Sequence, residues 1–165
     1  MKEGLLKLGL GLGTLSLLCW GITSQTKLRK CASESLEGIR YVLFLKSTSL
    51  KRGDIVLIPN HPIFYVGENP LAKRVLGFPG DRIIRDTGQL KVESKNITNQ
   101  MILSATLPLL DKTKEGHPLT PNSLPIVPEG YIFVVGDHSR SFDSRYKEFG
   151  LVPMEKIWGK EIVTW

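Results

Sequence analysis

Short apolar runs separated by turn residues make up most of the chain beyond Lys30. The runs are rich in Val, Ile, Phe, Tyr and Trp, and Gly, Pro, Asn and Asp stand between them, as is typical of β-strands joined by turns. This part of the sequence has no sustained helical periodicity. The pattern therefore predicts a mainly β domain over residues 31–165, with strands at 39–45, 54–59, 63–67, 73–78, 81–85, 90–94, 130–137 and 156–165.

A proline-rich stretch at residues 107–128 interrupts the series of runs. Proline has no backbone N–H and removes a donor from a β-ladder, so several prolines close together disfavour a central strand. We expect this stretch to form a long connection between two strands.

The N-terminal thirty residues follow another pattern, with an apolar stretch from Leu8 to Ile22 and a basic cluster at 27–30. The stretch is short for a membrane-spanning helix, so the hydrophobic region of a cleaved signal peptide is an alternative. Its glycines disfavour a third interpretation, a buried helix of a soluble domain. Because no clear small-x-small cleavage site follows, we expect residues 1–30 to comprise a short tip, a retained transmembrane anchor and a basic flank.

The charge of the chain is basic, with 22 Lys and Arg residues against 16 Asp and Glu and a formal net charge of +6. The basic residues are scattered, which gives little support to nucleic-acid binding and fits a surface that faces anionic lipid headgroups about as well. Two cysteines, Cys19 and Cys31, and three histidines do not have the spacing of metal ligands. The sequence therefore indicates no metal, no cofactor and no nucleic-acid partner.

Four stretches carry the residues that could perform chemistry: "CASESLEG" at 31–38, "LKRGDIVLIP" at 50–59, "LAKRVLGFPGDRI" at 71–83 and "GDHSRSFDSR" at 136–145. Taken alone, the last of these is also what an ordinary polar turn after a strand contains. Their order and wording together resemble the type I signal peptidase family, whose serine peptidases use a Ser–Lys dyad. The resemblance extends from Ser33 to Val152 and implies a signal-peptidase-like antiparallel β domain behind one N-terminal transmembrane helix.

The resemblance implies a catalytic pair formed by Ser35 as nucleophile and Lys73 as general base. A lysine can take the proton of a serine hydroxyl only when it is neutral, which requires apolar burial to lower its pKa. Considered alone, Lys73 is more typical of a surface lysine on an edge strand, and the stretch around Ser35 is also what a linker between a membrane helix and a domain contains. The surrounding "KRVLGFPGD" favours the catalytic interpretation.

The resemblance also implies a role for Ser33, whose hydroxyl would help the backbone N–H of Ser35 to hold the oxyanion. His138 is a less suitable general base, because Asp137, His138 and Ser139 are adjacent and point apart along the chain, whereas a triad needs partners that converge in space.

Further supporting roles follow from the "GDHSRSFDSR" stretch. By resemblance, Ser141 would orient the dyad lysine, and Asp143 and Arg145 would form a salt bridge behind it. Gly136 and Asp137 match the "GD" with which the same box begins in the family.

Two other boxes are expected to serve packing and turn geometry. These are Arg52–Asp54, which precedes a predicted strand, and Phe78–Asp81, "FPGD". In the second box Pro followed by Gly suits a type II turn, in which glycine supplies a positive φ.

Departures from the ordinary signal peptidase pattern indicate a subfamily. "LEG" follows Ser35 where Met-Pro is usual, and the last box is shorter. These features look more like the conjugative-transfer peptidases, which mature the pilin subunits of type IV secretion systems, some by joining the new ends into a ring. The resemblance therefore implies a single-pass, monomeric enzyme of the bacterial inner membrane, with its N-terminus inside and its catalytic domain on the periplasmic or outer face.

The expected partners are the lipid bilayer and a membrane-anchored preprotein or pilin precursor, whose leader would add as a strand to an exposed sheet edge near Ser35. Two alternatives stay open. One is a general type I signal peptidase for secreted precursors, and the other is a catalytically inactive membrane-anchored β module of a secretion system.

Overall fold

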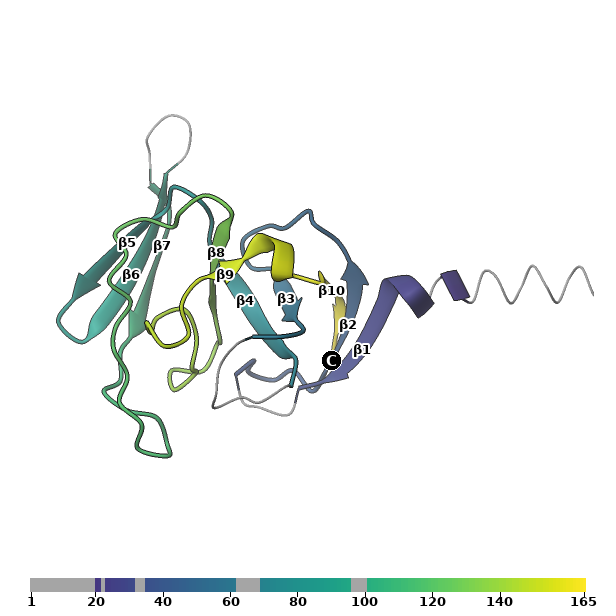
Figure 1. Cartoon of the computed structure of the whole chain (residues 1–165), viewed down its shortest axis with the longest axis horizontal. Helices are drawn as coiled ribbons and strands as arrows, with labels where there is room; N and C mark the ends of the chain where they lie inside the picture. The colour runs from purple at the N-terminus through teal and green to yellow at the C-terminus, as the bar shows by residue number, and fades with distance from the viewer. Residues whose placement is uncertain (1–19, 22, 32–34, 62–68, 96–100) are drawn as a thin grey trace, which may run out of the picture.

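The computed structural model describes residues 20, 21, 23–31, 35–61, 69–95 and 101–165, without the side chains of 95 and 101–104. These residues form two antiparallel sheets that lie side by side (Figure 1). The strands are β1 (Thr26–Lys30), β2 (Tyr41–Lys46), β3 (Ile55–Ile58), β4 (Leu71–Gly77), β5 (Arg82–Asp86), β6 (Gln89–Lys95), β7 (Met101–Pro108), β8 (Tyr131–Val135), β9 (Val152–Pro153) and β10 (Gly159–Thr164), with a 3₁₀ helix, η1, at Met154–Lys156.

The larger sheet has the strand order β1-β2-β10-β3-β4-β8-β9. It curls so that side chains from β2 and β3 meet a residue of the segment before β2, forming one core cluster of Leu36, Val42, Phe44, Ile55 and Leu57. The side of the sheet that holds this cluster is called the concave face below. Alternation along β2 leaves Tyr41 and Leu45 on the opposite, convex face, where both are exposed.

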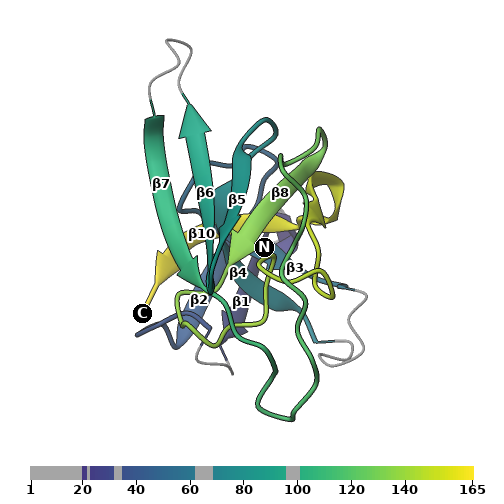
Figure 2. The same cartoon turned by 90° about the vertical axis from the view of Figure 1, so that its left-hand side faces the viewer.

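The smaller sheet has the order β5-β6-β7 and packs against the end of the larger one (Figures 1 and 2). A second core cluster joins them, because Leu90 and Val92 of β6 pack with Phe133 and Val135 of β8. Burial of these side chains is the main attraction between the sheets.

Arg52 adds a polar link between the two sheets. Its guanidinium donates to the Leu76 carbonyl at 2.7 Å, to Asp81 Oδ1 at 2.8 Å and to Ser94 Oγ at 2.8 Å. The expected turn at Phe78–Asp81 is present, with Gly80 at φ 87° and the Asp81 N–H donating to the Phe78 carbonyl. The packing role expected for both boxes is therefore confirmed for Arg52 and for this turn.

The prediction of a mainly β domain is confirmed, and seven of the eight predicted runs overlap strands of the structure. The eighth, residues 63–67, lies outside the described residues. The sequence analysis missed β1, β7 and β9. It also began the long connection two residues early, because β7 continues to Pro108; this proline can end the strand since β7 is at the edge of its sheet.

The strand β1 was missed because its sequence, TKLRK, is polar and lies in the predicted basic flank. A charged strand is typical of a sheet edge, where its open backbone faces solvent and charge prevents unwanted pairing. β1 is such an edge, since it pairs only with β2 among the described residues.

The predicted membrane segment, Leu8 to Ile22, lies almost entirely outside the described residues. Of the part that the structure describes, Trp20, Gly21 and 23–25 are helical and lead directly into β1. Within the described ranges, no helix has the length and apolar character needed to cross a membrane.

Candidate active site

Three polar side chains from distant parts of the sequence meet on the larger sheet. Lys73 Nζ lies 2.7 Å from Ser141 Oγ and 3.2 Å from Ser35 Oγ, and the two hydroxyl oxygens are 3.5 Å apart. The sheet register explains this meeting: Arg74 on β4 pairs with Val135 on β8, so the loop that leaves β8 begins beside Lys73. The structure therefore brings together the predicted nucleophile, base and orienting residue.

Lys73 is buried, with 3% of its surface exposed. It alternates along β4 with Val75 and Gly77 on the buried side of the strand. Burial lowers the pKa of Lys73 to about 8. The negative charges of Asp143 and Asp137 oppose this shift, and the positive charge of Arg145 adds to it. A substantial fraction of the amine is therefore neutral near pH 8, as a general base requires.

A fully buried ion pair supports the loop that carries Ser141. The Arg145 guanidinium donates to both carboxylate oxygens of Asp143, at 2.8 Å each, and Asp143 Oδ2 also accepts from the backbone N–H of Gly136 at 2.9 Å. Arg145 further donates to the carbonyls of Ser141 and Ser139, both at 2.9 Å. Such a network gives the loop one arrangement, because every buried charge has its partners in that arrangement only.

The residues that begin this loop contact the backbone of the candidate nucleophile. The Asp137 N–H donates to the Ser35 carbonyl at 2.6 Å. The Asp137 carboxylate accepts two hydrogen bonds from the Arg74 guanidinium, at 2.7 and 2.8 Å, and Arg74 also donates to the Gly53 carbonyl. A Cβ at Gly136 would lie 2.6 Å from Ser141 Cβ and 2.7 Å from the Ser35 carbonyl oxygen, so only glycine fits there.

Two other sequence predictions have different outcomes. Ser33, the predicted oxyanion donor, lies outside the described residues. The imidazole of His138 accepts a hydrogen bond from the Arg140 N–H at 3.1 Å, within its own loop. The sequence analysis judged His138 a less suitable general base, and this stays a prediction.

Sequence reasoning missed the contribution of Arg74. The residue was noted only as part of a matching box, and nothing in the sequence pairs it with Asp137, which is 63 positions away. An arginine next to the predicted base was the one available signal.

A cavity of about 230 Å³ opens beside Ser35. Its apolar wall is formed by Leu36, Leu57 and Ala72, and it is also bordered by Arg29 and Lys30 at the end of β1. Cys31 also lines it; burial raises the pKa of this thiol. The cavity places a small apolar space directly next to the candidate nucleophile.

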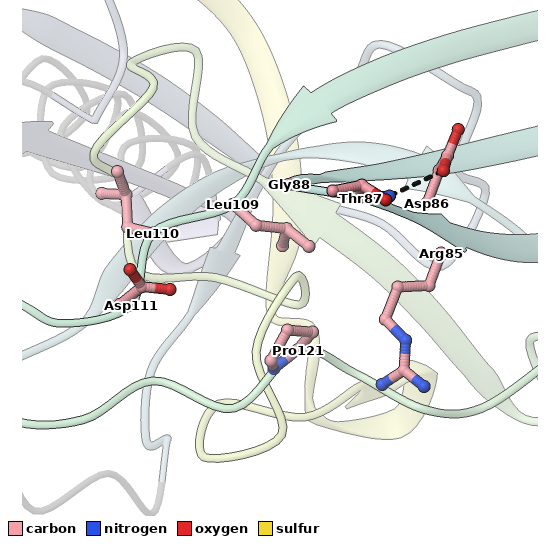
Figure 3. Close-up of a pocket in the computed structure, with 8 residues that line it drawn as sticks. All are labelled: Arg85, Asp86, Thr87, Gly88, Leu109, Leu110, Asp111 and Pro121. Atoms are coloured by element: carbon pink, nitrogen blue, oxygen red, sulfur yellow. Dashed lines mark hydrogen bonds between the residues drawn. The ribbon is translucent and has the colours of Figure 1, made fainter.

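A larger cavity, of about 510 Å³, lies in another part of the molecule, at the turn between β5 and β6 (Figure 3). Arg85 and Asp86 line it from the end of β5, and Asp111 and Pro121 from the long connection. None of the three clustered active-site side chains borders this cavity, so it is separate from the site.

The chain is similar to known proteins of one peptidase family. The sequence model of the family described as "Signal peptidase, peptidase S26" matches residues 8–165. A probable conjugal transfer protein TraF of Sinorhizobium fredii (strain NBRC 101917 / NGR234) is 36% identical over 101 residues, which are 60% of this chain and 48% of that protein.

Signal peptidase I proteins are also similar. The protein of Bacillus amyloliquefaciens is 32% identical over 68% of this chain and 56% of its own length. The protein of Bacillus licheniformis is 33% identical over 73% of this chain and 59% of its own length. The chain thus spans about half to three-fifths of these relatives. A solved signal peptidase I from Enterococcus faecalis V583 is 26% identical, with a TM-score of 0.40, over 68% of this chain and 96% of that one.

Proposed function

The chain belongs to the peptidase S26 family of signal peptidases, and from this premise we propose that it is a membrane-anchored serine endopeptidase that cleaves leader peptides with a Ser35–Lys73 dyad. One observation carries the proposal: the buried amine of Lys73 lies within hydrogen-bonding distance of both Ser35 Oγ and Ser141 Oγ. No described carboxylate forms a salt bridge with Lys73. A buried lysine without such a partner costs stability, and catalysis gives a reason for that cost.

The proposed reaction begins with neutral Lys73. Its amine takes the proton of Ser35 Oγ while that oxygen attacks the scissile carbonyl carbon. When the tetrahedral intermediate collapses, the C–N bond breaks, Lys73 returns the proton to the leaving amine, and an acyl-enzyme ester on Ser35 remains. The Ser141 hydroxyl, 2.7 Å from the amine, holds Lys73 in line with Ser35.

The acyl-enzyme has two possible acceptors. A water molecule, deprotonated by Lys73, yields a free carboxyl end and regenerates Ser35. A substrate amine attacking the same ester breaks the bond to Ser35 Oγ and passes its proton through Lys73 to that oxygen. This yields a new amide, regenerates Ser35 and joins two ends of the substrate. In both cases we propose that the Ser33 hydroxyl and the Ser35 N–H stabilise the oxyanion.

The substrate would bind as an extended segment beside β1. The edge of β1 opposite β2, which no described strand pairs with, offers backbone donors and acceptors, and the 230 Å³ cavity next to Ser35 accommodates a small side chain before the scissile bond. This arrangement supports a leader peptide with small residues near its cleavage site.

The narrower proposal is that the substrate is a conjugative pilin subunit, which the enzyme matures and possesses the chemistry to cyclise. It is supported by the similarity to the conjugal transfer protein of Sinorhizobium fredii and by "LEG" after Ser35. A general signal peptidase is the second candidate, because the Bacillus signal peptidase I proteins match over a larger share of the chain. The cluster of Ser35, Lys73 and Ser141 argues against the inactive module.

We place the enzyme at the inner membrane, with the anchor in residues 1–30 and the domain of residues 31–165 on the outer face, acting as a monomer. Exposed apolar side chains near the proposed anchor support this placement, since such clusters mark membrane or protein contacts. They come from β1, β2 and the β10 end of the chain: Leu28, Tyr41, Leu45, Ile162, Val163 and Trp165.

Co-expression with a pilin precursor from the same organism tests the proposal, with the precursor's mass read by intact-protein mass spectrometry. The wild type should shorten the precursor, Ser35→Ala, Lys73→Ala and Ser141→Ala should not, and Ser139→Ala in the same loop is the matched control. A product one water lighter than the linear fragment would indicate ring closure. Normal processing by Lys73→Ala would refute the dyad, and cleavage of a generic secreted precursor alone would favour the second candidate.

A further inference from the structure

The edge strand β1 directs two basic side chains toward the concave face. In the antiparallel register Lys27 pairs with Phe44 and Arg29 with Val42, and directly paired residues project from the same face. Phe44 and Val42 are fully buried in the concave cluster. Lys27 and Arg29 therefore share that face.

Lys27 and Arg29 differ in what they contact. Lys27 Nζ lies 4.4 Å from the centre of the Trp158 ring, an interaction that holds its charge in place. Arg29 borders the cavity beside Ser35, and in the described part of the chain no carboxylate forms a salt bridge with it. Arg52, Arg74 and Arg145, by contrast, each have such a partner.

The described residues that line the cavity supply no negative charge for Arg29. They combine basic residues with apolar side chains such as Leu57 and Ala72, and none of them is Asp or Glu. The Arg29 side chain is exposed, so its attraction for an acidic group at the border of the cavity is that of an ion pair partly screened by solvent.

An extended peptide would present its side chains to this arrangement in alternation. If it adds to the edge of β1 that no described strand pairs with, every second side chain faces the concave side, where Arg29 and Cys31, which follows the end of β1, are two residues apart along the chain. The peptide side chain that lies beside Cys31 would also lie next to Ser35 and the apolar wall of the cavity. The peptide side chain two positions from it would face Arg29.

We propose that Arg29 is a specificity-determining residue that selects an acidic side chain in the substrate, two positions along the peptide from the small residue held in the cavity beside Ser35. The inference rests on the proposed peptidase function and adds a charge requirement to it.

Cleavage of a peptide set by the full-length protein in neutral detergent tests the inference. The peptides are of equal length, carry Ala at the centre, and place Asp, Asn or Lys at one position at a time on either side; mass spectrometry gives the cleaved bond and the relative kcat/KM. We expect one position at which the wild type prefers Asp over Asn by about three-fold, the size of a partly exposed ion pair, and this preference should decrease with added salt.

Three variants isolate the contribution of Arg29. Arg29→Glu should reverse the preference to Lys, and Arg29→Gln should abolish the preference for Asp over Asn. Arg85→Glu has the same change of charge on β5, beside the separate cavity, and should keep the wild-type preference.

An equal Asp-to-Asn ratio in the wild type and Arg29→Gln would overturn the inference while leaving the peptidase function intact. The inference would also be overturned if Arg29→Glu changed cleavage only in the presence of vesicles of anionic phospholipid, since Arg29 would then bind the membrane surface. If the wild type cleaves no peptide and no precursor in cells, the proposed function itself fails.

Discussion

Gly136 and Ser141 pack so closely that there is no room between them for one additional carbon atom: a Cβ on Gly136 would lie 2.6 Å from Ser141 Cβ. The same atom would lie 2.7 Å from the carbonyl oxygen of Ser35. The backbone that leaves β8 is thus in direct contact with two of the three side-chain positions of the proposed active site. Its precise path decides whether their hydroxyl groups reach Lys73.

Gly136→Ala should therefore inactivate the enzyme without unfolding it. We expect processing of a precursor to fall about 100-fold, because a displacement of about 1 Å at a reacting group has that effect, and the free energy of unfolding to fall by about 1–3 kcal/mol, as for other overpacked sites. Precursor processing and thermal unfolding measure the two effects.

Gly77→Ala is the matched control, since its Cβ would meet Phe133 Cβ at 2.8 Å in the core between the sheets, away from Ser141. It should destabilise the protein to a similar degree with a much smaller loss of activity per folded molecule. Equal activity losses in the two variants would show that Gly136 serves folding alone.

The pH dependence of cleavage should report the neutral form of Lys73. With a pKa of about 8, the amine is mostly protonated below that pH, so kcat/KM should fall about ten-fold per pH unit there and level off above it. Initial rates on one peptide between pH 6 and 10 measure this. A rate that is highest near pH 6 would exclude a lysine base.

Lys73→Met should be inactive but more stable than the wild type. The folded protein binds the lysine proton more weakly than the unfolded chain, in which the pKa is near 10.5. The resulting penalty, about 3 kcal/mol at most, is complete below pH 8 and disappears as the pH rises from about 8 to 10.5.

Urea unfolding of both proteins at several pH values tests this sign. Lys73→Met should exceed the wild type by about 1–3 kcal/mol at pH 7, and the difference should shrink toward pH 10. Lys73→Arg provides a control that keeps the charge and should be inactive, because a guanidinium is not deprotonated in this range. A difference that does not change with pH would contradict the lowered pKa.

Asp143→Asn should be strongly destabilising, because it leaves the buried guanidinium of Arg145 without its charged partner. Removing one member of a buried pair costs about 3–5 kcal/mol. Chemical denaturation measures the loss. Arg82→Ala is the comparison, since Arg82 is 55% exposed and 4.0 Å from Glu93, and its loss should cost less than about 1 kcal/mol. Similar losses of stability in the two variants would show that the Asp143–Arg145 pair stabilises the fold no more than an exposed ion pair does.

Much of the fold could be predicted from local pattern. Val56 and Ile132 lie within runs of apolar residues bounded by turn signals, and both are fully buried in strands. Gly80 was expected to have a positive φ because it follows Pro79, and it does. The strand β1 could not be predicted in this way, since a charged edge strand has the composition of a loop and is stabilised by its partner β2.

The local sequence limits the chemistry that this protein can perform. It placed Ser35, Lys73 and Ser141 in boxes that resemble one family, because residue types and short spacings are properties of the chain alone. The tertiary structure decided what those residues can do together. Only the pairing of β4 with β8 brings Lys73 beside Ser141, and only the packing around the strand removes enough water to lower the lysine pKa. Proximity and desolvation depend on segments far apart in sequence, and no local pattern encodes them.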